Sequence, residues 1–111
     1  MEIAFCSQKM QKLCNSEKEM RSKLGDRGAK VLQVRLAQIK AAETLDDMRN
    51  VPGARCHGLT GDRQGQLAVD LVHPRRLVFE ADHNPLPVKP DGGLDWQKVT
   101  RVVVREIVDY H

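Results

Sequence analysis

A change of hydrophobic pattern at Pro52-Gly53 divides this sequence into a helical first half and a strand-rich second half. Before this point, apolar residues recur at intervals of three and four, which is the spacing of one face of a helix. After it, short alternating runs are separated by turn residues, as in antiparallel strands. With 111 residues, the chain is the size of one small domain. We therefore expect a single α+β domain over residues 1–111.

The first half is predicted to hold one strand and two helices. Residues 2–6 are apolar enough for a strand, and Ser7 is placed to cap a following helix. Ser16, with Glu19 three residues later, is typical of a capping box at the start of a second helix. The best-patterned part of that helix spans residues 26–42. Glycines near this part leave it open whether the helix is broken there. Its two apolar stripes should face the sheet and a second element: Ala29, Leu32, Leu36 and Ile39, then Met20, Leu24, Val31 and Val34.

The second half is predicted to be mainly strand. The strand candidates are residues 54–60, 66–73, 76–81 and 99–109. Turns at 61–65 and around Pro74 join the first three, which should follow one another as antiparallel strands. Residues 82–98 form a long loop that is either functional or a tolerated insertion. Trp96, on a short helical turn, should anchor this loop.

Plain alternation along the last strand predicts which side each residue occupies. One side would carry Val102, Val104, Val108 and Tyr110, and the other Val103, Arg105, Ile107, Asp109 and His111. Apolar residues on both sides indicate a strand in the interior of the sheet, covered on both faces near its middle.

The composition excludes several classes of protein. Apolar runs are too short for a transmembrane helix, and the first residues carry an acid where a signal peptide carries basic residues, so we expect a cytoplasmic protein without membrane contacts. Cys6, Cys14 and Cys56 lack C-x-x-C spacing and are expected to be reduced thiols. No potential ligands have the spacing of a metal site, and no phosphate loop or dinucleotide motif is present, so we expect neither metal nor cofactor.

Positive charge is concentrated in the helical half. Residues 2–40 hold nine Lys or Arg against four acids, whereas residues 41–111 hold nine against eleven. A basic half of this kind is compatible with a nucleic-acid partner or an acidic protein partner. It is also typical of ordinary solvated helix faces.

Five polar residues of the second half could act together on a phosphodiester. Asp109, Tyr110 and His111 are consecutive, His57 lies on an earlier strand candidate, and Arg76 opens another. Cleavage of RNA by its own 2′-hydroxyl needs a base, an acid and positive charge facing the phosphorane oxygens. These side chains can supply all three without a metal. The same residues also fit a polar tail and ordinary strand-end positions.

Four segments together resemble the HigB-type toxins of bacterial toxin-antitoxin modules, which belong to the RelE superfamily. The segments are residues 55–65 (RCHGLTGDRQG), 68–71 (AVDL), 75–80 (RRLVFE) and 108–111 (VDYH). The resemblance covers nearly the whole chain. It implies a RelE-like single domain, in which an initial strand and two helices precede an antiparallel sheet. It also implies a ribosome-dependent endoribonuclease that cuts mRNA in the ribosomal A site.

The resemblance assigns roles to the same polar residues. His57 matches the family histidine, Arg76 the strand arginine that faces the scissile phosphate, and Asp109, Tyr110 and His111 the C-terminal catalytic residues. A histidine or Asp109 would assist proton removal. Arg76 would stabilise charge, and Tyr110 would orient or stack on a nucleotide.

Thr60 departs from the family pattern, since many relatives carry a lysine at this position. Arg55 or Arg63 would have to replace its charge. The loop at 82–98 is a second departure from the shorter members and would reshape partner contacts. The residues expected to face ribosomal RNA or mRNA are Lys9, Lys12, Arg21, Arg27, Lys30, Arg55 and Arg63, with Lys18, Lys23 and Arg35 beside them.

The implied partners are a helix-turn-helix antitoxin of the HigA type, the ribosome and mRNA, with operator DNA reached only through the antitoxin. Two alternatives stay open. One is a ParE-like toxin that inhibits a protein such as gyrase without cutting RNA, and Thr60 favours it mildly. The other is a catalytically decayed domain that binds an antitoxin and DNA as a co-repressor.

Overall fold

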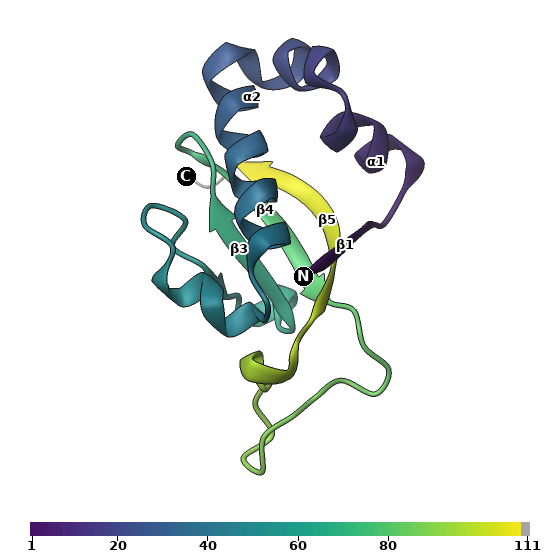
Figure 1. Ribbon diagram of the computed structural model, residues 1–111, viewed down its shortest axis with the longest axis vertical. Coiled ribbons are helices and arrows are strands. Elements are labelled where there is room, and N and C mark those ends of the chain that lie inside the picture. The colour runs from purple at the N-terminus through teal and green to yellow at the C-terminus, as the bar shows by residue number, and fades with distance from the viewer. Residues whose placement is uncertain (110–111) are drawn as a thin grey trace.

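The strands form one five-stranded mixed sheet in the order β1-β5-β4-β3-β2, and α2 lies across one of its faces (Figure 1). The computed structural model describes residues 1–109. β1 runs parallel to β5, and every other neighbouring pair is antiparallel. The predicted α+β class is confirmed, with an initial strand and two helices before the antiparallel strands. Within residues 1–109, no helix is long and apolar enough to cross a membrane.

The helical half begins with β1 (Glu2–Phe5), α1 (Gln8–Asn15) and α2 (Glu17–Ala41). Both predicted N-caps are present. The Ser7 hydroxyl accepts a hydrogen bond from the Met10 amide at 3.1 Å, and the Ser16 hydroxyl accepts one from the Glu19 amide at 3.2 Å. These local bonds satisfy amides that a helix start otherwise leaves without partners, so both helices begin where the sequence indicated.

α2 bends at Gly25, so the break left open near the glycines falls at this residue. Its φ of +78° lies in the left-handed region, which glycine adopts without steric cost. Beyond the bend, the first predicted stripe enters the core, where Leu32 and Ile39 are fully buried. The second stripe is divided, because Met20 is buried whereas Val34 is exposed.

A 3-10 turn, η1 (Leu45–Asn50), leads from α2 toward the sheet. β2 (His57–Gly58) then follows, and the longer strand expected over residues 54–60 was wrong. The Ala54 carbonyl accepts a hydrogen bond from the Asp70 amide at 2.7 Å. Arg55, with a φ of +49°, turns the chain out of the extended path before β2 begins.

The remaining strands are β3 (Gln66–Asp70), β4 (Arg75–Ala81) and β5 (Arg101–Asp109). The 3-10 turn η2 (Gly61–Arg63) joins β2 to β3, and a turn containing Pro74 joins β3 to β4. The predicted antiparallel succession is therefore confirmed, with strand ends shifted by a few residues.

A β-bulge at Arg105 changes the face that the end of β5 presents. Val104 pairs with Phe79 and Glu106 with Val78, so Arg105 has no partner in the register. The next pair, Leu77 with Ile107, places Ile107 on the core side. The predicted alternation was therefore wrong beyond Arg105. β5 is interior to the sheet over residues 101–104, and beyond them, among the described residues 1–109, a strand lies on one side of it only.

The loop at 82–98 ends in η3 (Trp96–Lys98), which confirms the helical turn predicted around Trp96. The Arg49 guanidinium lies 3.9 Å from the centroid of the indole ring and joins this loop to η1. Val88 pairs with Leu94 across the loop, yet Leu86 and Val88 stay exposed.

Candidate functional site

The sheet has two chemically different faces. The core face packs into the hydrophobic core and includes Leu67, Val69, Leu77, Phe79, Val102 and Val104. Successive residues of a strand point to opposite sides, so the intervening residues form a second face, which we name the polar face. It includes Gln66, Ala68, Asp70, Arg76, Val78, Glu80 and Glu106, together with the apolar Val103 and Val108, and His57 is added by its pairing with Ala68.

Asp70 stands between two arginines at one end of the polar face. Its Oδ1 lies 3.2 Å from Nε of Arg76, which pairs with it across β3 and β4. Its Oδ2 lies 3.6 Å from the guanidinium of Arg55. Within residues 1–109, Oδ1 accepts no hydrogen bond of good geometry, so its attraction to Arg76 is that of an ion pair. The carboxylate thus holds two cations beside each other.

His57 lies near Asp70 on the same face of the sheet. It opposes Ala68, which is two residues from Asp70 on the same face of β3, so His57 and Asp70 are diagonal neighbours. Nδ1 of His57 lies 2.7 Å from the carbonyl oxygen of Arg55. A hydrogen bond donated from Nδ1 to this oxygen assigns the ring proton of a neutral imidazole to Nδ1 and leaves Nε2 as an acceptor. The ring can then accept a proton at Nε2.

Arg63 belongs to a second charged cluster on the polar face. Its guanidinium lies 2.6 Å from Oε1 of Glu106 and donates to the side-chain oxygen of Gln66 at 3.0 Å. Gln66 donates to Glu80 at 3.1 Å, and Arg105 lies 3.6 Å from the same carboxylate. Arg63 is therefore held on the sheet by Glu106. Of the two candidates to replace the charge missing at Thr60, only Arg55 lies in the His57 cluster.

Asp109 is on the other side of the sheet from this cluster. It lies opposite Arg75 in the register, and their side chains form an ion pair of 3.3 Å. Arg75 and Leu77 share the core-facing side, whereas Arg76 is on the polar face. The structure thus places His57 and Arg76 on the same face of the sheet, on β2 and β4 with β3 between them, and places Asp109 on the other face. Tyr110 and His111 lie outside the described residues.

The basic residues expected to face RNA are distributed over two separate regions. Arg55 and Arg63 lie at the polar face, as described above. The others are exposed on the helices, except Arg35, which is half-buried and donates to the carbonyl oxygens of Asp70 at 2.7 Å and Gly53 at 2.9 Å. Lys12 lies 3.8 Å from Glu19, and Arg21 donates to Glu17 at 2.8 Å one helical turn away. Both pairs are solvated and contribute little to stability. The exposed helical positions are Lys9, Lys12, Arg21, Arg27 and Lys30.

Asp70 is the residue of the cluster that the sequence did not single out as a candidate. The sequence feature that could have identified it is a single carboxylate at the end of an apolar strand, in the run QLAVDL. Such a carboxylate, only 22% exposed in the fold, needs a cationic partner. The arginines at 75 and 76 in the next strand were the available partners.

The two less accessible cysteines are poor nucleophiles. Burial raises the pKa of Cys56 to about 12, although the positive charge of Arg49 acts in the opposite direction. Burial likewise raises the pKa of Cys14 to about 11. Both thiols therefore stay protonated near neutral pH. Within residues 1–109, the cysteines form no disulfide, and no group of three His, Cys, Asp or Glu residues is arranged to hold a metal ion.

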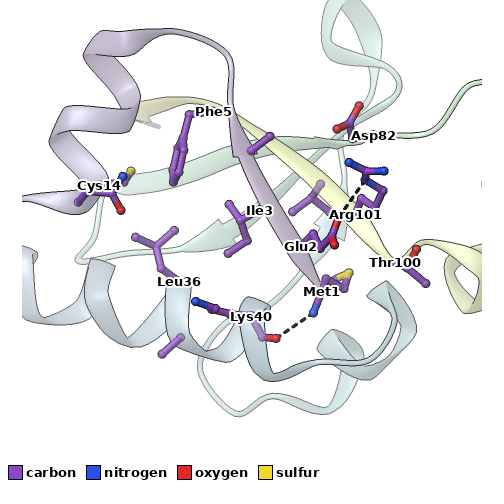
Figure 2. Close-up of a pocket in the computed structure, with 14 residues that line it drawn as sticks. Met1, Glu2, Ile3, Phe5, Cys14, Leu36, Lys40, Asp82, Thr100 and Arg101 are labelled. Atoms are coloured by element: carbon purple, nitrogen blue, oxygen red, sulfur yellow. Dashed lines mark hydrogen bonds and ion pairs between the residues drawn. The ribbon is translucent and has the colours of Figure 1, made fainter.

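A groove of about 1,090 Å³ runs along the outer side of β1, away from the His57 cluster. Figure 2 shows Ile3, Phe5 and Leu36 on its apolar side and the ion pair between Glu2 and Arg101 on its polar side. At one end, the backbone nitrogen of Met1 donates to the carbonyl of Lys40 at 2.9 Å. Two further cavities, of about 530 and 430 Å³, are also lined by residues outside the cluster.

Comparisons with known proteins assign this chain to no family, since no family model matches it and no curated protein matches it significantly.

Proposed function

We propose that this protein is a metal-independent endoribonuclease that cuts mRNA on the ribosome, acting as a cytoplasmic toxin of the RelE-like, HigB type. The observation that carries the proposal is the cluster on the polar face, where His57 is the diagonal neighbour of Asp70 and Asp70 holds two arginines. A base next to paired guanidinium groups is what attack by an RNA 2′-hydroxyl requires. The order of strands and helices and the quoted sequence segments also support the family resemblance.

In the proposed reaction, Nε2 of His57 takes the proton from the 2′-hydroxyl as its oxygen attacks the neighbouring phosphorus. Arg76 and Arg55 stabilise the negative charge that grows on the phosphorane oxygens. The bond from phosphorus to the 5′-oxygen then breaks, leaving a 2′,3′-cyclic phosphate. The leaving oxygen needs a proton, which we assign to the C-terminal residues Tyr110 and His111.

Dependence on the ribosome fits the composition of the chain. Aromatic residues make up only 4% of it, so few rings are available to splay and stack single-stranded RNA. Asp70 also partly neutralises the two arginines. An RNA that is not held by another body would therefore rarely reach the geometry of in-line attack. We further propose that a helix-turn-helix antitoxin neutralises the protein and connects it to operator DNA.

Primer extension on a defined mRNA, with and without bacterial ribosomes, tests this function. We expect cuts within the translated frame only when ribosomes are present. Arg76→Ala and His57→Ala should each reduce cleavage by about 100-fold, because each removes a group that acts in the transition state. Arg101→Ala is the matched control, since Arg101 is also a strand arginine in an ion pair but lies at the far end of β5. Equal cleavage by all four proteins would contradict the proposal.

A non-nucleolytic toxin that inhibits a protein target is the second candidate. The position of Asp109 favours it, because this carboxylate pairs with Arg75 on the side of the sheet away from His57. Toxicity in cells without any cut mRNA, and unchanged by Arg76→Ala, would support this alternative. If the protein is not toxic in cells but the purified protein still binds an antitoxin, these results would support a co-repressor role instead.

A further inference from the structure

A basic groove lies between the helices and the outer edge of β5, separate from the His57 cluster. It has a volume of about 530 Å³ and is lined by residues of α1, the first turns of α2 and the second half of β5. In Figure 1, α1 and the start of α2 extend beyond the end of β1, above the curved end of β5. We name this cavity the β5-edge groove; its lining is Ser7, Lys9, Met10, Lys12, Leu13, Glu19, Lys23, Arg105, Glu106 and Ile107.

The strand that borders this groove has an open edge. β1 pairs with β5 only over residues 101–104 and ends at Phe5. Past that point the Cys6 amide still donates to the Val104 carbonyl, and the Cys6 thiol lies 3.1 Å from the Arg105 carbonyl. Within residues 1–109, the part of β5 from Arg105 to Asp109 has β4 on one side and no strand on the other. Such an edge offers backbone groups to an added strand.

The charge of the groove favours an acidic ligand. Four cations and two carboxylates line it, and both carboxylates already have cationic partners. Glu106 is held by Arg63 at 2.6 Å, and Glu19 lies 3.8 Å from Lys12. Within the described residues, Lys9 and Lys23 form no ion pair, and both are exposed. These two lysines are therefore available to an incoming anionic group.

The floor of the groove distinguishes a peptide from a nucleic acid. Met10, Leu13 and Ile107 line it, and Leu13 is buried. Side chains of an added strand that point toward the helices would cover this apolar floor, and acidic side chains at the ends and on the outer side of the segment would be attracted by the surrounding lysines and Arg105. The phosphate backbone of a nucleic acid would form ion pairs with the lysines. It would neither cover the apolar floor nor form hydrogen bonds along the strand edge as an added strand does.

We propose that the β5-edge groove binds an extended acidic segment of a partner protein, which adds to the sheet as a strand beside Arg105 to Asp109, in line with β1. At about 3.3 Å per residue, this edge accommodates roughly five residues of such a segment. The inference stands apart from the proposed ribonuclease activity, since no residue of the His57 cluster lines the groove.

The probe is a fluorescein-labelled peptide of seven residues, in which glutamate alternates with valine or leucine. Its binding is measured by fluorescence anisotropy. A peptide with lysine in place of each glutamate and a seven-nucleotide RNA are the comparison ligands. We expect the acidic peptide to bind at least about tenfold more tightly than either, and its binding to weaken as salt increases. The triple variant Lys9→Glu, Lys12→Glu, Lys23→Glu should weaken binding by about tenfold or more. Lys89→Glu with Lys98→Glu, outside the groove, is the control.

Hydrogen exchange on the wild-type protein provides a second readout that does not depend on a variant. Added strand pairing should slow the exchange of amides among Glu106, Ile107 and Val108 when the acidic peptide is present. Absence of binding at millimolar peptide, or binding without this protection, would overturn the proposal. Tighter binding of the RNA, lost in the triple variant, would also overturn it and would reassign the groove to nucleic acid.

Discussion

Arg76 and Asp70 face each other directly across β4 and β3, with Nε of the arginine 3.2 Å from Oδ1 of the aspartate. Both side chains are about three-quarters buried, so the pair is shielded from solvent more than an ordinary surface ion pair. The contact holds the guanidinium in place before any ligand arrives. A preset cation is more useful to catalysis than a mobile one, because less ordering is needed in the transition state.

Asp70→Asn should destabilise the fold, because it leaves the partly buried Arg76 without the carboxylate and removes the contact with Arg55. We expect the free energy of unfolding to fall by about 1–2 kcal/mol. Urea denaturation measures this change. Asp62→Asn is the control, because Asp62 is exposed and forms no ion pair within residues 1–109. An equal effect of the two substitutions would contradict the role assigned to Asp70.

The thiol of Cys56 should make stability depend on pH in the alkaline range. Its pKa rises from 9.0 to about 12 in the fold, so folding favours the neutral thiol. The resulting stabilisation is complete below pH 9 and is lost as the pH rises from 9 to 12. The Tm of the wild type, measured by thermal unfolding, should therefore fall more steeply with pH over this range than the Tm of Cys56→Ala. Parallel declines of the two proteins would show that this thiol is not linked to folding.

Arg49→Ala should loosen the anchor of the loop at 82–98. The guanidinium stacks on Trp96, and such contacts contribute about 0.5–1 kcal/mol. Because Trp96 is the single tryptophan, its fluorescence reports directly on this contact. We expect a shift of the emission maximum to longer wavelength and a lower urea midpoint. Arg21→Ala, which removes an exposed ion pair on α2, should change neither quantity measurably.

Gly25→Ala should destabilise the bend in α2. The backbone at Gly25 has a φ of +78°, where a Cβ introduces strain even though no neighbouring atom lies within 4 Å of it. A loss of about 1 kcal/mol is expected in chemical denaturation. Gly58→Ala is the matched control, since its added Cβ also meets open space but the backbone is not left-handed. A stabilised Gly25→Ala protein would show that α2 can straighten at this point.

The features that local chemistry determines could be predicted from the sequence. Ser7 and Ser16 cap their helices through bonds to residues only three positions away, and Trp96 lies on the expected turn. Features that depend on a partner strand could not. The length of β2 depends on where Ala54 meets Asp70, and the bulge at Arg105 depends on the register with β4.

The candidate site shows the same division. His57 and Arg76 could be recognised as residue types suited to phosphodiester chemistry, and the fold places them on one face. The pairing of Asp70 with two arginines required the register of β3 and β4. Plain alternation also could not show on which side Asp109 lies, because the bulge intervenes.

The bulge at Arg105 acts as a one-residue phase shift in β5. Deleting Arg105 would remove this extra residue and leave Glu106, Ile107 and Val108 opposite the same residues of β4, on the same faces of the sheet. Deleting Glu106 while the bulge is kept would instead move Ile107 to the position opposite Val78 on the polar face, where Glu106 now contacts Arg63. The effect of a deletion at the end of β5 on the two faces therefore depends on its position relative to the bulge.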